Sequence, residues 1–125
     1  MIRYNYNTQF DPPAPLVLVT LRNPRTGQFV ADQPAQLDHA ADFSVLPDAV
    51  IEQLQLNPHG ELEAMGLGRR VSVVTTYLVD IELHEFRHRS VKVNSSDEPF
   101  VLIGRDILNQ HRVVLDGPRL KLEIE

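Results

Sequence analysis

The sequence predicts a mostly β domain with one helix and a second, shorter helical segment. Apolar and polar residues alternate over several stretches, most clearly between Arg70 and Leu83, and this period of two is typical of strands. Clusters rich in Pro, Gly and Asn separate these stretches, as expected of turns. The 125 residues are enough for one hydrophobic core, so we treat residues 1–125 as a single domain.

Composition and charge argue against several classes of function. The net charge is −5 and no run of Lys and Arg occurs, which argues against nucleic acid or an anionic membrane surface as a partner. No apolar run approaches the roughly 18 residues of a membrane span, and the N-terminus lacks the apolar core of a signal peptide, so we expect a cytoplasmic protein. The chain has no Cys, which rules out disulfides and Cys-ligated metal, and we expect neither a bound metal nor a cofactor.

Four β segments are predicted in the N-terminal third of the chain. The first places Ile2, Tyr4 and Tyr6 on one face, and the second is a continuous apolar run. The segments cover 2–6, 16–21 and 28–31, followed by a strand that ends at Asp38, and the breaks between them are 11–15, 23–27 and 32–34. The tight turn at 23–27 makes the second and third segments antiparallel neighbours.

A helix is predicted after this β region. Pro47 fixes the backbone for a helix start, and Val50, Ile51 and Leu54 then share one face. The Pro and Gly of the segment 57–60 end it.

A long hairpin is predicted beyond the helix. Residues 61–65 form one arm and 70–83 the other, whose apolar face runs from Val71 to Leu83. The tip consists of Met65, Gly66, Leu67 and Gly68, and its glycines would let the backbone approach a ligand closely.

The C-terminal third is predicted to be strand again, apart from a short helix after Gly104. The apolar stretches cover 91–93, 100–103, 113–115 and 120–124, with turns at 95–99 and 116–118. The segments 2–6 and 120–124 both present an apolar face that one small domain has little means to cover. We therefore expect these terminal strands to lie in a dimer interface.

Two short motifs carry the chemistry that we predict. The first brings a carboxylate to the end of a strand and a second carboxylate four residues later, before an apolar run closed by Pro47; it reads Asp38-His39-Ala40-Ala41-Asp42. The second follows the apolar residues 101–103 and reads Gly104-Arg105-Asp106.

In this order and spacing the two motifs resemble those of the retropepsin-like aspartic peptidases. The family signature is Asp-Thr/Ser-Gly-Ala-Asp, of which positions 38, 41 and 42 match, and the family also has Gly-Arg-Asp/Asn before a short helix. The resemblance extends over roughly residues 15–124. It implies a closed acid-protease barrel lobe with one or two short helices, which works as a homodimer on a polypeptide substrate.

The resemblance also implies roles for individual residues. Asp38 would be catalytic, because in the family two such aspartates share a proton and act as general base and general acid. Asp42 and Arg105 would form an ion pair that braces the loop, Gly104 would sit in tight packing, and Asp106 would support it. The hairpin tip at 65–68 would be the flap over bound peptide, although an ordinary surface hairpin is the alternative.

His39 and Ala40 depart from the family pattern beside the aspartate. An imidazole replaces a hydroxyl that in the family crosses the two-fold axis, and a methyl group replaces glycine next to the substrate. Either change is expected to lower activity. The function is therefore either a weak or altered aspartic endopeptidase or a catalytically silent module for peptide binding and dimerisation.

A further pattern, His84-Glu85-Phe86-Arg87-His88, fits the zinc-peptidase motif and leaves a remote third alternative. That motif acts on a helix, whereas here it follows a long stretch with strand periodicity and precedes another strand. We therefore predict a hairpin turn with solvated histidines. His59 and His111 have no partner at metal-ligand spacing and are predicted to be surface residues.

Overall fold

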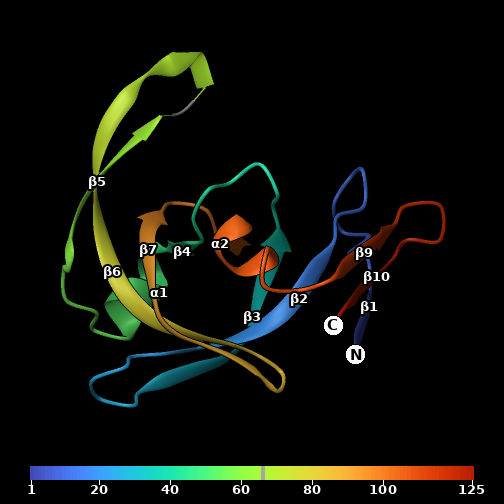
Figure 1. The fold of residues 1–125 in the computed structure, drawn as a ribbon, viewed down its shortest axis with the longest axis horizontal. Coiled ribbons are helices and arrows are strands. Elements are labelled where there is room, and N and C mark those ends of the chain that lie inside the picture. Colours follow the sequence, from blue (N-terminus) through green and yellow to red (C-terminus); the bar gives the residue numbers. More distant parts are fainter. Residues whose placement is uncertain (66) are drawn as a thin grey trace.

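The computed structural model describes residues 1–65 and 67–125 and is mostly β, with two short helices, as predicted (Figure 1). The strands are β1 Ile2–Asn5, β2 Leu16–Arg22, β3 Phe29–Leu37, β4 Val45–Pro47, β5 Gly60–Met65, β6 Val71–Leu83, β7 Phe86–Ser96, β8 Val101–Ile103, β9 Val113–Asp116 and β10 Lys121–Ile124. The helices are α1 Asp48–Gln53 and α2 Arg105–Leu108, and a 3₁₀ turn, η1, covers Leu67–Arg69. Within these described ranges no helix has the length and apolarity needed to cross a membrane.

A closed barrel forms the body of the molecule. The strands β2, β3, β8, β4, β7 and β6 follow one another in this order, and an additional pairing of β2 with β6 closes the ring. Leu21, Leu46 and Ile81 are among the side chains that fill its interior, together with Leu54 from the turn after α1. Alternation along each strand sends these residues inward and leaves polar residues outside.

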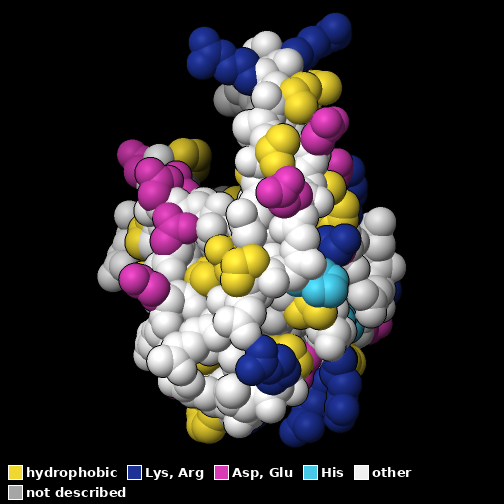
Figure 2. All heavy atoms as spheres, turned by 90° about the vertical axis from the view of Figure 1, so that its left-hand side faces the viewer, with side chains coloured by type: hydrophobic (Ala, Val, Ile, Leu, Met, Phe, Trp, Pro, Cys, Tyr) yellow, Lys and Arg dark blue, Asp and Glu magenta, His cyan; other side chains and the backbone are white. Residues whose placement is uncertain are grey.

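The hairpin of β5 and β6 extends beyond the barrel, as Figures 1 and 2 show. Gly60 pairs with Thr76 at its base and Met65 with Val71 near its tip. The predicted apolar face of β6 is buried only at its barrel end, and Val71 and Val73 are 57% and 62% exposed. Of the predicted tip, Gly66 lies outside the described residues.

Strand β3 corrects one prediction, because it runs without a turn from Phe29 to Leu37. The Asp32-Gln33-Pro34 segment, predicted as a turn, is part of this strand. Asp32 has φ of 54°, and the register between β2 and β3 shifts beside it. Such a bulge absorbs the turn-forming residues within a continuous strand.

Two further boundaries differ from the predictions. Ser95 and Ser96, predicted as a turn, extend β7 and pair with β4. Helix α1 ends at Gln53, before the predicted stop, because Leu54 and Leu56 turn into the core.

The terminal strands form a three-stranded sheet in the order β1-β10-β9 within one chain. Ile2 pairs with Ile124, and both side chains are buried, as is Leu122. The chain itself thus covers these apolar side chains, contrary to the premise of the predicted dimer interface, whereas contact of the terminal strands with a second copy stays a prediction. The outer strands β1 and β9 each have one edge that carries no partner strand in the described sheet.

Candidate functional site

Asp38 follows directly after β3, where the barrel begins to open. Strands β3 and β8 run parallel, with Leu37 opposite Ile103. One further hydrogen bond continues this pairing, from the Asp38 N–H to the Ile103 carbonyl at 2.9 Å. The position of Asp38 is therefore set by the barrel, and its half-buried carboxylate faces the start of a loop, residues 38–44, which we call the aspartate loop.

Hydrogen bonds within the aspartate loop fold it back on Asp38. The N–H of Ala40 donates to Asp38 Oδ1 at 2.9 Å, and the N–H of Ala41 donates to the Asp38 carbonyl at 3.2 Å. This side chain to backbone turn is typical of aspartate. His39 and Ala40, the two residues that differ from the family signature, are both exposed at the turn.

Arg105 holds the aspartate loop from outside. Its backbone N–H donates to the Ala41 carbonyl at 2.9 Å, and its guanidinium donates to the His39 carbonyl at 2.9 Å. The guanidinium also forms the ion pair with Asp42 that the resemblance implied. Both partners of this pair are largely exposed, so its contribution to stability is small and its effect is to fix the shape of the loop.

Asp106 and Ser44 close the other end of the loop. The Ser44 N–H and hydroxyl donate to the two Asp106 carboxylate oxygens at 3.0 and 2.8 Å, and the Gly104 N–H donates to the Ser44 hydroxyl at 3.1 Å. Ser44 is fully buried. Ser44 was not among the residues predicted for the site, although a single hydroxyl within an apolar run was the available signal.

Gly104 lies where the aspartate loop and β8 pass each other. A Cβ atom added to it would lie 2.7 Å from the Phe43 carbonyl carbon and 2.9 Å from the Ala41 oxygen. These are backbone atoms of the loop, so they have little freedom to move away. The φ of −90° at Gly104 is open to any residue, so the backbone conformation does not require glycine. Glycine is required here because the two backbones approach too closely to leave room for a Cβ atom.

A groove of about 390 Å³ lies between the aspartate loop and the hairpin. Figure 2 shows the hairpin standing above the body, with a hollow beside it. Phe43, Val45 and Leu62 give the groove apolar walls, and Asp42 and Met65 also line it. The structure thus brings one predicted tip residue to the same groove as the aspartate loop. Gly68, with φ of 79°, lies in η1 and does not line it.

The zinc-peptidase pattern lies in a hairpin, as predicted. His84 and Glu85 form the turn between β6 and β7, and His84 bonds the Tyr4 hydroxyl at 2.6 Å. His88 instead lies on β7 and is only 7% exposed, so the prediction that it is solvated is wrong. Among the described residues, no group of three or more His, Cys, Asp or Glu side chains is arranged to hold a metal ion.

His88 pairs with His111, which the sequence analysis placed at the surface without a partner. The two Nε2 atoms lie 2.8 Å apart, and the Nδ1 atoms face the Ile81 and Glu125 carbonyls at 3.2 and 3.0 Å. Carbonyls only accept, so each Nδ1 that makes its hydrogen bond carries a proton. Burial lowers the pKa of His88 below 6.5, and His111 lowers it further, against the hydrogen bond to Ile81 and the charge of Asp106.

No protein-family model matches the sequence, and no curated protein matches it. The structure is similar to the EIAV protease complexed with the inhibitor HBY-793, with a TM-score of 0.62 and 22% identity over 86% of this chain and 93% of that chain. For the simian foamy virus (mac) protease, the TM-score is 0.55 and the identity 13%, over 76% and 92% of the two chains. The foamy viral protease-reverse transcriptase with an RNA/DNA hybrid aligns at a TM-score of 0.55 and 14% identity over 78% of this chain and 12% of that one. Over most of its length, this chain therefore has the retropepsin-like fold that its motifs predicted.

Proposed function

We propose that the chain is an aspartic endopeptidase that hydrolyses peptide bonds with Asp38 from each of two copies. The observation that carries the proposal is the position of Asp38, at a barrel strand end within a loop held by Arg105 and Asp106. The same fold occurs in the EIAV protease, which was solved with an inhibitor bound. A polypeptide substrate would lie in the groove between the aspartate loop and the hairpin.

The proposed chemistry needs two carboxylates and therefore a homodimer. One carboxylate takes a proton from the attacking water while the other, protonated, donates to the scissile carbonyl. Each chain supplies one such carboxylate, Asp38. The free edges of β1 and β9 offer a second copy backbone groups to pair with.

His39 and Ala40 lower the rate in this proposal. Both lie at the exposed turn that follows Asp38, on the surface that the second copy would approach. The bulk of the imidazole and the added methyl group would hold the two carboxylates away from their best geometry. Small displacements of reacting groups are costly, and an error of about 1 Å can lower a rate by roughly 100-fold.

The test is a cleavage assay with a diverse peptide library at mildly acidic pH. The unmodified chain should cleave slowly, a statine-type transition-state mimic should inhibit it, and Asp38→Asn should abolish cleavage. Asp97→Asn removes the same charge from an exposed turn and should have no effect. Cleavage that survives Asp38→Asn would refute the proposed mechanism, and sedimentation of the active fraction as a monomer would refute the dimer.

A second candidate function is peptide binding without hydrolysis. The observation that favours it is the β1-β10-β9 sheet, in which the terminal strands pair with each other within one chain. This pairing removes one reason for two copies to associate. In that case, library peptides should shift the NMR signals of groove residues such as Phe43 and Leu62 while remaining intact. Asp38→Asn would then leave peptide affinity unchanged.

A further inference from the structure

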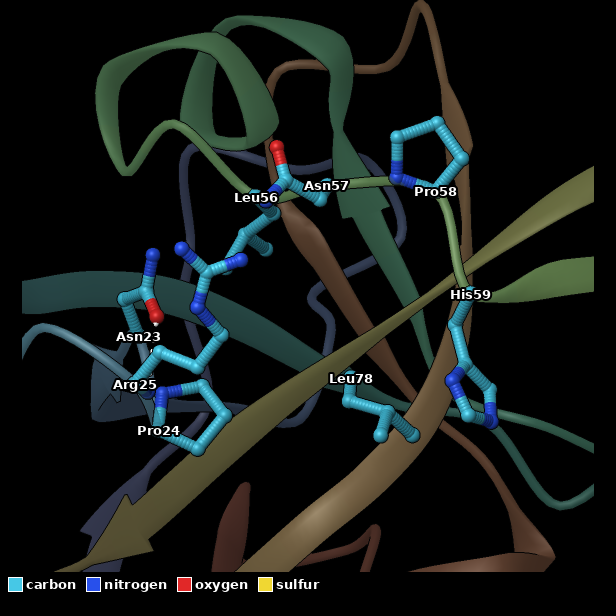
Figure 3. A pocket seen from close by; sticks show the side chains of 8 residues that line it. All are labelled: Asn23, Pro24, Arg25, Leu56, Asn57, Pro58, His59 and Leu78. Carbon is cyan, nitrogen blue, oxygen red and sulfur yellow. Dashed lines mark hydrogen bonds between the residues drawn. The ribbon is translucent and has the colours of Figure 1, made fainter.

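A second pocket, of about 210 Å³, lies away from the aspartate loop, at the base of the hairpin (Figure 3). Its walls come from three segments that are distant in sequence: the turn after β2, the connection from α1 to β5, and β6. The residues that line it are Asn23, Pro24, Arg25, Leu56, Asn57, Pro58, His59 and Leu78. None of them is Asp42 or another residue of the aspartate loop, so this pocket is separate from the groove.

Hydrogen bonds hold the pocket walls in place without a ligand. The Asn23 side chain, only 5% exposed, donates to the Leu54 carbonyl at 2.9 Å and accepts from the Arg25 N–H at 2.9 Å. The other wall is tied to the hairpin by the His59 N–H, which donates to the Thr76 carbonyl at 2.7 Å. The backbone walls of the pocket are therefore fixed by the fold, which reduces the entropy cost of binding.

The lining carries one permanent cation, the Arg25 guanidinium, and no carboxylate. Arg25 and His59 bring the titratable groups, and Asn57 adds a neutral amide. Figure 3 shows Pro24 and Arg25 on one side of the pocket, Pro58 and His59 on the other, and Leu78 between them. Within the described part of the chain, the Arg25 guanidinium has no hydrogen bond or ion pair.

The remaining lining is apolar and rigid. Leu56 is buried at the base, Leu78 is half-buried, and Pro24 and Pro58 form stiff side walls. A site of this kind combines an apolar surface with a small number of polar groups that orient the ligand. Its volume is below the roughly 300 Å³ of the smallest drug-sized pockets, so it suits a ligand with few heavy atoms.

We propose that this pocket binds a carboxylate attached to a short branched apolar group, with Arg25 on the carboxylate and Leu56 and Leu78 against the apolar part. A guanidinium binds a carboxylate through two parallel hydrogen bonds, which gives both affinity and orientation. Two sources share this chemistry, a small free carboxylic acid and the C-terminal residue of a peptide. Either ligand contacts the strand β6 and the residue before β5, so it restrains the base of the hairpin that covers the groove.

The test is an NMR titration of the full chain with 4-methylpentanoate, which does not depend on peptidase activity. The amide signals of Arg25, His59 and Leu78 should shift in a saturable way. The uncharged 4-methylpentanamide should bind at least about tenfold more weakly, because it cannot form the charge-assisted pair with the guanidinium. Equal binding of acid and amide, or no saturable shift at tens of millimolar acid, would overturn the proposal.

Two variants of equal charge give the matched comparison. Arg25→Gln should weaken binding about tenfold, whereas Arg70→Gln removes an exposed arginine of the hairpin outside the pocket and should leave it unchanged. Equal weakening by both would show a general charge effect and refute the site. An acetylated dipeptide ending in free leucine, measured together with its C-terminal amide, identifies the source of the carboxylate. If the dipeptide acid binds more tightly than 4-methylpentanoate, the natural ligand is a peptide C-terminus. If it binds more weakly, the natural ligand is a small free acid.

Discussion

Replacing Gly104 by alanine probes the closest packing of the aspartate loop. The new Cβ would lie 2.7 and 2.8 Å from the carbonyl carbon and oxygen of Phe43 and 2.9 Å from the Ala41 oxygen. Ordinary carbon contacts are about 3.5–4.0 Å, so the two backbones must separate by roughly 0.5–1 Å. The φ of −90° at residue 104 is open to alanine, so the destabilising part of the effect comes from this contact.

The expected loss is at the upper end of what overpacking usually costs, about 3 kcal/mol. Side chains relieve such contacts by changing rotamer, but here the opposing atoms belong to the backbone. For a chain of this size about 1 kcal/mol shifts the melting temperature by roughly 4 °C, so Gly104→Ala should lower it by roughly 10 °C. Urea unfolding at constant pH measures the free energy, and NMR shifts at Asp38 and Ala41 report whether the loop moves.

Gly117→Ala is the matched control for this experiment. Nothing lies within 4 Å of a Cβ at Gly117, and its φ is not in the left-handed region. The same chemical change should there be neutral or slightly stabilising, by about 0.4–1 kcal/mol, because alanine restricts the unfolded chain. If both variants unfold at the same urea concentration, the close approach at Gly104 does not exist as described.

Three other predictions concern the loop and the histidine pair. His39→Thr with Ala40→Gly should raise the cleavage rate at mildly acidic pH, measured on the same peptide library, and an unchanged rate in a folded double variant would place the defect elsewhere. Asp106→Ala should cost roughly 1–3 kcal/mol in urea unfolding, because it leaves Ser44 buried without its acceptors, whereas Asp106→Asn should cost less. Because the pKa of His88 is lowered, the native state binds fewer protons than the unfolded state, so the free energy of unfolding should hold above pH 6.5 and fall below it. His88→Phe should flatten this fall in urea titrations between pH 5 and 7.5, and an unchanged slope would contradict it.

The sequence predicted the parts of the site that are local in the chain. Asp38 and Asp42 stand four residues apart after a strand, and Arg105 and Asp106 follow another strand. Both strands were recognisable from the alternation of apolar and polar residues and from the turn-forming residues at their ends. The structure adds the partners that join them. Ser44 contacts Asp106 across 62 positions, and no local pattern reports a hydrogen bond of that span.

The errors share one physical cause, which is that tertiary contacts override local signals. The turn-forming residues at 32–34 lie inside β3, because pairing with β2 continues before and after them and a bulge takes up the extra residues. His88 followed a turn and was expected in solvent, yet it is buried against His111, 23 positions away. The terminal strands were expected to leave their apolar faces uncovered, because a partner strand at the other end of the chain is not visible in a local pattern.

Within the chain, Ile103 and Arg105 fix the start of the aspartate loop, and Asp106 fixes its end. The terminal strands β1 and β10 likewise pair with each other within the chain. The proposed reaction, in contrast, needs Asp38 from two copies. Folding of the loop and assembly of the two carboxylates are then separate events, the first governed by packing at Gly104 and the second by protein concentration. It follows that the cleavage rate per chain should rise with protein concentration, because the two carboxylates come together only when two copies associate.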